Sequence, residues 1–176
     1  LKFNGEELGS RIWYRLCDIL YATGIAENFQ VAETIIANYN PRMCHFTPAI
    51  VSLLYRKYET VMSQQAKEKI KDYLLSVRDE FMGHDLDFIG VNDNFPMMST
   101  LTAMNMAAMF DDDVMQKEAE RRLKQLECLL KRRGVLSEYT SVVYSALQIN
   151  VLARLTEYAT CEAFKTIAQN AQIRVW

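Results

Sequence analysis

The sequence predicts an all-α fold built from antiparallel helical hairpins. Apolar residues recur at helical spacing along almost the whole chain, and strand-like alternation is nearly absent. Only 6 Gly and 3 Pro interrupt the 176 residues. Half of the residues are apolar and 24% are charged, a composition typical of a globular protein rather than a disordered or fibrous one. We expect a single domain that covers residues 1–176.

Helical spacing predicts eight helices. They are expected at 8–22, 27–38, 48–61, 64–82, 96–110, 113–133, 142–158 and 161–175. The segments 96–110 and 142–155 carry almost no charge and are apolar on nearly every side, so neighbouring elements should cover each of them. Each of these two helices is followed by an amphipathic helix, which has one apolar stripe and charged residues on the opposite face. In 113–133 the stripe consists of Met115, Ala119, Leu126 and Leu130.

The hairpins recur along the chain with a period of 46–48 residues. Pro48 and Pro96 are 48 residues apart, and both fall in the first turn of an expected inner helix, where proline is tolerated. The hairpins are therefore placed at about 8–38, 47–82, 95–133 and 141–175. Such a period with two helices per repeat is typical of a helical array.

The connections before the inner helices favour a partial (α/α) toroid over an open solenoid. They are longer and richer in polar and aromatic residues than solenoid turns usually are. Four hairpins make about four of the six that a closed toroid generally contains. A further segment of chain or a neighbouring subunit of a homo-oligomer would complete the wall.

Charge and cysteine content exclude several classes of partner. The formal net charge is -2, so no basic surplus predicts a nucleic-acid partner. No apolar run approaches the ~18–20 residues that span a bilayer, so no membrane segment is expected. The four cysteines are far apart, and no metal site or cofactor is predicted. Cys17 and Cys128 fall on apolar helical stretches, where we expect buried thiols.

Two acidic residues stand out as a candidate catalytic pair. Asp93 precedes one inner helix and Glu138 precedes the next, which places them ~10 Å apart if the two helices pack side by side. Paired carboxylates are what glycoside hydrolysis requires, and we predict Glu138 as the acid and Asp93 as the base. The alternative is that Asp93, Asn94 and Ser141 only cap helices and that Glu138 is a solvated loop acid.

Other residues of the same connections are predicted to bind the sugar. Aromatic rings stack on sugar faces, and amides, hydroxyls and carboxylates bond to sugar hydroxyls. The set comprises Asn92, Asn94, Tyr139, Ser141, Tyr144, His45 and Asp87. The run 111–113 is expected to be a turn in which Asp113 caps the following helix.

Two segments carry a resemblance to a known family. DLDFIGVNDNFPMMSTLTAM (85–104) and GVLSEYTSVVYSALQINVLARLTEYA (134–159) resemble a pair that recurs in the six-hairpin glycosidase-like αα-toroid proteins. There the second segment usually reads S-E-Y-(N/T)-S-P-x-Y, whereas Val142 stands here at the proline position. The resemblance is best over about 83–159. It implies a toroid with an active site at its mouth, in a glycoside hydrolase or a polysaccharide lyase.

The predicted function is therefore that of a carbohydrate-active enzyme, a glycoside hydrolase acting on an oligosaccharide or polysaccharide. A lyase is the nearest alternative, with Tyr139, Tyr144 or His45 as the base and Asn92 or Asn94 neutralising a uronate. The sequence shows no arginine-rich rim to hold a polyuronate, which disfavours the lyase. A third alternative is a non-catalytic helical scaffold that binds a protein partner in its groove.

Overall fold

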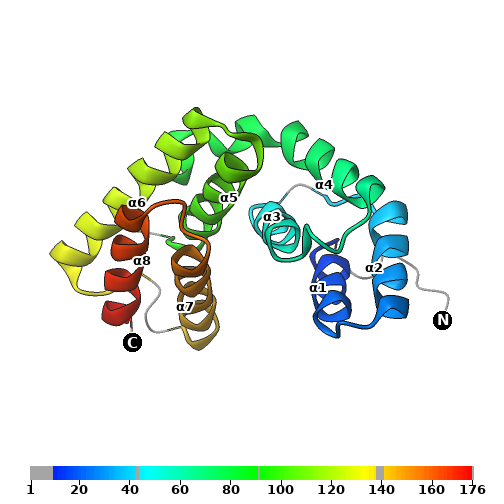
Figure 1. The fold of residues 1–176 in the computed structure, drawn as a ribbon. Coiled ribbons are helices and arrows are strands. Elements are labelled where there is room, and N and C mark those ends of the chain that lie inside the picture. The colour runs from blue at the N-terminus through cyan, green and yellow to red at the C-terminus, as the bar shows by residue number, and fades with distance from the viewer. Residues whose placement is uncertain (1–9, 43, 91, 138–140, 176) are drawn as a thin grey trace. The chain divides into compact units, whose positions relative to one another are not determined.

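The fold is all-helical, as predicted. A computed structural model describes residues 10–42, 44–90, 92–137 and 141–175, and these residues form helices and no strand. The α-helices are α1 (Ser10–Ala22), α2 (Ala26–Asn38), α3 (Thr47–Tyr58), α4 (Gln64–Ser76), α5 (Asn94–Phe110), α6 (Asp113–Arg133), α7 (Val142–Glu157) and α8 (Glu162–Val175) (Figure 1). Two short 3-10 helices, η1 (Arg78–Phe81) and η2 (His84–Leu86), lie between α4 and α5.

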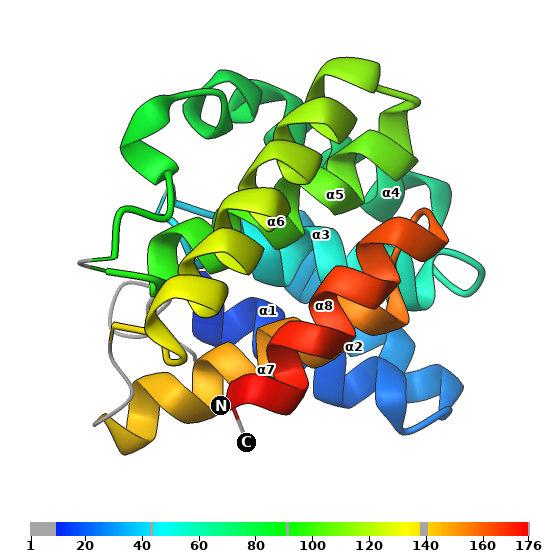
Figure 2. The ribbon, with the colours of Figure 1, turned by 90° about the vertical axis from the view of Figure 1, so that its left-hand side faces the viewer.

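The chain divides into two compact units of two hairpins each. The first unit is Leu1–Arg78 and the second is Asp79–Trp176. In the first unit α1 packs on α3 and α2 packs on α4, and in the second α5 packs on α7 and α6 packs on α8. Figure 2 shows α6 and α8 running side by side. Both units therefore follow one rule, in which inner helix stacks on inner helix and outer helix on outer helix.

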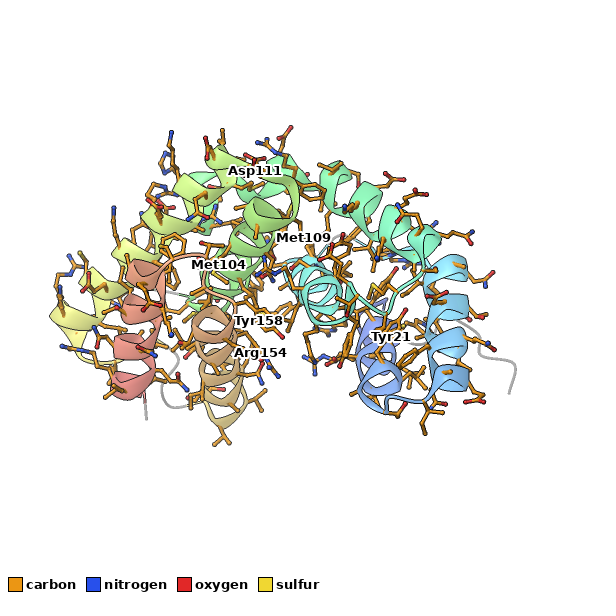
Figure 3. All side chains as sticks on the ribbon, in the orientation of Figure 1. Tyr21, Met104, Met109, Asp111, Arg154 and Tyr158 are labelled. Atoms are coloured by element: carbon orange, nitrogen blue, oxygen red, sulfur yellow. The ribbon has the colours of Figure 1, made fainter. Side chains whose placement is uncertain are left out.

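The second unit is built around α5, an inner helix without a single charged side chain. Thirteen of its 17 residues are buried, as the sequence predicts for a helix that is apolar on nearly every side. Met104 is wholly buried (Figure 3). Helix α6 covers α5 with its predicted apolar stripe, because Met115, Ala119, Leu126 and Leu130 are all buried.

The outer helices are tied together in the same way in both units. In the first unit, Lys69 Nζ on α4 donates to the Ala37 carbonyl oxygen in the last turn of α2, at 2.6 Å. In the second, Arg174 Nη1 on α8 donates to the Leu130 carbonyl oxygen in the last turn of α6, at 3.4 Å. A cation at a helix C-terminus satisfies carbonyls that lack helical partners and complements the helix dipole.

Two helix ends differ from the prediction. The helix expected over 64–82 ends at Ser76, where the Val77 N–H bonds to the Leu74 and Leu75 carbonyls and the chain tightens into η1. The predicted cap Asp113 is wrong by one residue. Asp112 caps α6, because its Oδ1 accepts from the amides of the second and third residues of the helix, at 3.0 and 3.1 Å. Asp111, at the turn between α5 and α6 (Figure 3), adopts a left-handed backbone conformation, which allows the chain to reverse direction there.

Two expectations about burial are wrong. Helix α7 was expected to be covered on most sides, but its first turn is open, with Val142 86% and Val143 74% exposed. Its contacts with α5 and α8 cover only one face. Cys128 is exposed. It lies two residues after the buried Leu126, about 200° around the helix at 3.6 residues per turn, and therefore on the outer face.

No helix in the described ranges is long and apolar enough to cross a membrane.

The burial of the thiols predicts a difference in their reactivity. Cys17 is buried, its Sγ lies 3.6 Å from the Ala32 carbonyl oxygen, and burial raises the pKa of its thiol to about 12. Cys44, Cys128 and Cys161 are exposed. Because the thiolate is the reactive form, a thiol reagent at pH 7.5 should label those three cysteines in the native protein and Cys17 only after unfolding. Rapid labelling of Cys17 in the native state would contradict this packing of α1 on α2.

Candidate functional site

The two polar connections of the second unit meet, as the sequence predicts. Asp93 directly precedes α5, and its Oδ2 accepts a hydrogen bond from the Ser137 main-chain N–H at 2.5 Å. Ser137 lies in the connection that leads to α7 and directly precedes Glu138. A side chain from one connection therefore holds the main chain of the other, 44 residues further along the sequence.

A second contact joins the inner helices just behind this one. Gln148 Nε2 on α7 donates to Asn94 Oδ1 in the first turn of α5, at 3.3 Å, and both side chains are buried. Buried amides are stable in an apolar interior only when they are hydrogen-bonded, so this pair fixes how α5 and α7 pack. The sequence contains a signal for Gln148, because it is a polar residue on the buried face of a largely uncharged helix.

The capping alternative is correct for one residue and incorrect for two. Ser141 caps α7, because its Oγ accepts from the Tyr144 N–H at 3.3 Å. Asn92, rather than Asp93 or Asn94, caps α5 by accepting from the Asn94 N–H at 3.0 Å. The carboxylate of Asp93 is thus free of the helix end and spans to the neighbouring connection.

Asp93 is wholly buried in the fold. Its Oδ1 is also buried and has no hydrogen-bond partner in the part of the chain that the structure describes. A buried carboxylate that accepts a hydrogen bond from a main-chain N–H holds a loop in position. Because it is buried, it does not contact a sugar that binds from the solvent side. This geometry suits a positioning role better than the predicted role as the base.

Asp87 belongs to a separate polar network on α6. Its carboxylate accepts from Arg121 Nη2 at 2.5 Å and from Gln125 Nε2 at 3.0 Å, and it contacts His84 Nδ1 at 3.1 Å. Arg121 also pairs with Glu118, at 2.6 Å. With its carboxylate so engaged, Asp87 anchors the connection 83–90 to α6 and is not available to bind a sugar.

A buried arginine continues this network. Arg122 is wholly buried, lies 2.8 Å from Glu118 Oε1, and donates from Nη2 to the carbonyl oxygens of Phe81 and Gly83. The guanidinium therefore fixes the segment that leads from η1 to η2. The sequence carries a signal for Arg122, because it stands at helical spacing between Ala119 and Leu126 on an otherwise apolar stripe.

The remaining predicted site residues lie in three different situations. Tyr144 is on the open first turn of α7 and is 43% exposed. His45 lies in the first unit, in the turn before α3, and its part in a site stays a prediction. Glu138 and Tyr139 lie outside the described residues.

No metal cluster occurs among the described residues, and one groove lies away from the candidate site residues. The described ranges contain no group of three His, Cys, Asp or Glu side chains that could hold a metal ion. A groove of about 250 Å³ lies between the C-terminal ends of α6 and α8. It is lined by Glu127, Leu130, Lys131, Ile167, Asn170, Ala171, Ile173 and Arg174, none of which is a candidate site residue.

Comparison of the chain with protein-family models, with curated proteins and with solved structures finds no match. The resemblance to the six-hairpin family therefore stays a prediction from the two segments quoted above.

The contact between Asp93 and Ser137 predicts a stability effect. Asp93→Ala removes the acceptor of the partly buried Ser137 N–H, and we expect a loss of about 1–3 kcal/mol in the free energy of unfolding. Chemical denaturation followed by helical circular dichroism measures it. The exposed Asp85 provides a control, because Asp85→Ala should change the free energy by no more than ~0.5 kcal/mol. Equal effects of the two substitutions would contradict a structural role for Asp93.

The network around Asp87 predicts a loss of stability in acid. Burial raises the pKa of Asp87, but hydrogen bonds from Arg121, Gln125 and His84 outweigh burial and hold that pKa well below its ordinary value. The pKa of Glu118 is lowered in the same way, because the hydrogen bond from Arg121 and the charge of Arg122 outweigh its burial. A carboxyl with a lowered pKa stabilises the fold fully above its unfolded-state pKa of ~4, and this contribution disappears as the pH falls through the folded-state pKa.

We therefore expect the urea concentration at the unfolding midpoint to decrease as the pH is lowered from 5 to 2.5. Asp87→Asn should make this decrease smaller. Asp85→Asn is again the matched control, since its carboxylate is exposed. An unchanged pH profile in Asp87→Asn would show that the network does not supply the acid sensitivity.

Proposed function

We propose that the second unit carries the reactive loop of a carbohydrate-active enzyme, most simply a glycoside hydrolase. The observation that carries the proposal is the 2.5 Å contact between Asp93 Oδ2 and the Ser137 N–H. It joins the two connections in which the candidate carboxylates stand. Consecutive Cα atoms are about 3.8 Å apart, so Glu138 begins one residue from a main-chain group held by Asp93.

In this proposal Glu138 is the acid that meets the glycosidic oxygen, and Asp93 is a positioning residue. The carboxylate of Asp93 fixes the main chain just before Glu138, and a catalytic group held in one geometry reacts faster than a mobile one. The buried Asp93 thus serves the proposed reaction without touching substrate.

The burial of Asn94 favours hydrolysis over elimination in this proposal. A lyase would use the amide N–H groups of Asn92 or Asn94 to neutralise a uronate, but Asn94 is only 2% exposed and its Oδ1 accepts from Gln148. Asn94 therefore does not meet a substrate, and Asn92 is held at the start of α5 by its Oδ1. The proposed substrate is a chain whose cleavage needs proton donation to the leaving oxygen.

The scaffold alternative is favoured by one specific observation. The first turn of α7 exposes Val142, Val143 and Tyr144 together. Exposed apolar side chains that cluster in this way mark surfaces that contact other molecules. A helical scaffold would use this turn to bind a partner and would perform no chemistry.

Glu138→Gln tests the proposal. On a panel of polysaccharides, the wild type should release reducing ends without the ultraviolet absorbance of an unsaturated uronate. Glu138→Gln should lower that rate roughly 100-fold or more, because it removes the proton donor. Glu80→Gln, at an exposed acid of η1, is the matched control and should keep the wild-type rate.

The other outcomes select among the alternatives. A rise in the ultraviolet absorbance of an unsaturated uronate would assign the lyase reaction. No product from the wild type on any substrate would favour the scaffold. A wild-type rate in Glu138→Gln would contradict the proposed role of this loop.

A further inference from the structure

The groove between α6 and α8 takes no part in the proposed carbohydrate site. The two helices run side by side (Figure 2), and the groove of about 250 Å³ lies between their C-terminal parts. Its volume equals that of about eight water molecules, at ~30 Å³ each. None of its lining residues belongs to the connections that carry Asp93 and Glu138. The groove is therefore a separate concave surface with its own chemistry.

The floor of the groove is aliphatic. Leu130 of α6 and Ala171 of α8 are buried, and Ile167 is half-buried between them and the solvent. Ile173, which also lines the groove, is 74% exposed. The lining contains no aromatic ring, so it offers no flat face on which a sugar or a nucleobase could stack. An aliphatic chain fits this lining, because it would remove the apolar surface of Ile173 from water.

The rim of the groove carries a cation that no carboxylate balances. Lys131 Nζ pairs with Glu127 Oε1 at 2.9 Å, so these two charges offset each other. The side chain of Arg174 has no carboxylate partner among the described residues, and its Nη1 donates to the neutral carbonyl of Leu130 at 3.4 Å. A guanidinium has five N–H donors, so most of those of Arg174 remain for a ligand.

The charge around the groove is positive as well. The last turn of α6 contains three cations, at 131–133, and the last turn of α8 contains Arg174. No acidic residue occurs in 128–137 or in 163–175. Glu127 offsets one of the four cations, and the partial negative charges of the two helix ends, at ~0.5 each, offset about another. The remaining positive charge favours an anion at the groove.

We propose that this groove binds an aliphatic carboxylate, with its carboxylate on Arg174 and its chain on Leu130, Ile167 and Ile173. A guanidinium and a carboxylate can form two parallel N–H···O bonds, which fix the orientation of the ligand. Room for about eight water-sized groups limits the chain to roughly eight carbons. The inference does not rest on the proposed function, because its test measures binding and not cleavage of a polysaccharide.

Titration of the isotope-labelled chain with octanoate, followed by nuclear magnetic resonance, tests the inference. We expect the amide signals of Lys131, Ala171 and Ile173 to shift, with a dissociation constant on the order of 1 mM. Hexanoate should bind more weakly, by up to about fourfold for each methylene group removed. Octanol should also bind more weakly than octanoate, because it has no charge, and octylamine more weakly still, because Arg174 repels it.

Arg174→Gln separates the ion pair from the apolar contact. It should weaken octanoate binding roughly tenfold or more and leave octanol binding unchanged, because only the carboxylate uses the charge of the guanidinium. Lys117→Gln, at an exposed cation in the first half of α6, is the matched control and should leave the binding of both ligands unchanged.

Ile173→Ser tests the apolar part of the groove. It should weaken octanoate and octanol alike, because both chains use the same aliphatic surface. Val114→Ser, at a half-exposed valine in the first turn of α6, is its control and should weaken neither. Circular dichroism of each variant checks that the helices are intact.

Four outcomes would contradict the inference. Octanoate that shifts no signal of the groove at concentrations well above the expected dissociation constant would overturn the site, as would shifts confined to other parts of the chain. Equal affinities for octanoate and octylamine would overturn the choice of an anion. An unchanged octanoate affinity in Arg174→Gln would overturn the role of that residue.

Discussion

The second unit depends on the burial of a long helix that has no charged side chain. Helix α5 can lie in the interior because its side chains need no water, but its N-terminal amides still need hydrogen-bond partners. Asn92 provides a cap, Asn94 bonds to Gln148, and Asp93 reaches across to Ser137. Asn92 serves the helix end itself, whereas Asp93 and Asn94 contact the neighbouring connection and α7, so the start of α5 carries both its cap and the contacts that join the two connections.

A second set of polar contacts positions the first segment of the second unit. Arg121 and Arg122 both project from α6, but the first engages the Asp87 carboxylate and the second the carbonyls of Phe81 and Gly83. Glu118 accompanies both cations, so the charges within this network partly balance one another. Because a buried cation without partners costs much free energy, these contacts fix the path of 81–90 on α6.

The sequence predicts the helices well because their signal is local. Apolar spacing and the turn residues between helices place all eight of them, and the lack of charge in 96–110 indicates its burial. Details that depend on tertiary partners are not accessible in this way. The early end of α4, the choice of Asp112 over Asp113 as cap, and the open first turn of α7 each depend on neighbouring groups. For the candidate site, the meeting of the two connections follows from the repeat, but the burial of Asp93 does not.

Hydrogen exchange at the Ser137 amide tests the central claim most directly, because that N–H is the group that Asp93 holds. The fold described here predicts that this amide exchanges far more slowly than the amide of Val135, an exposed residue in the same connection, and that Asp93→Asn accelerates it. If the Ser137 amide exchanged as fast as that of Val135 in the native protein, the connections would not be joined, and the carbohydrate proposal would lose its support.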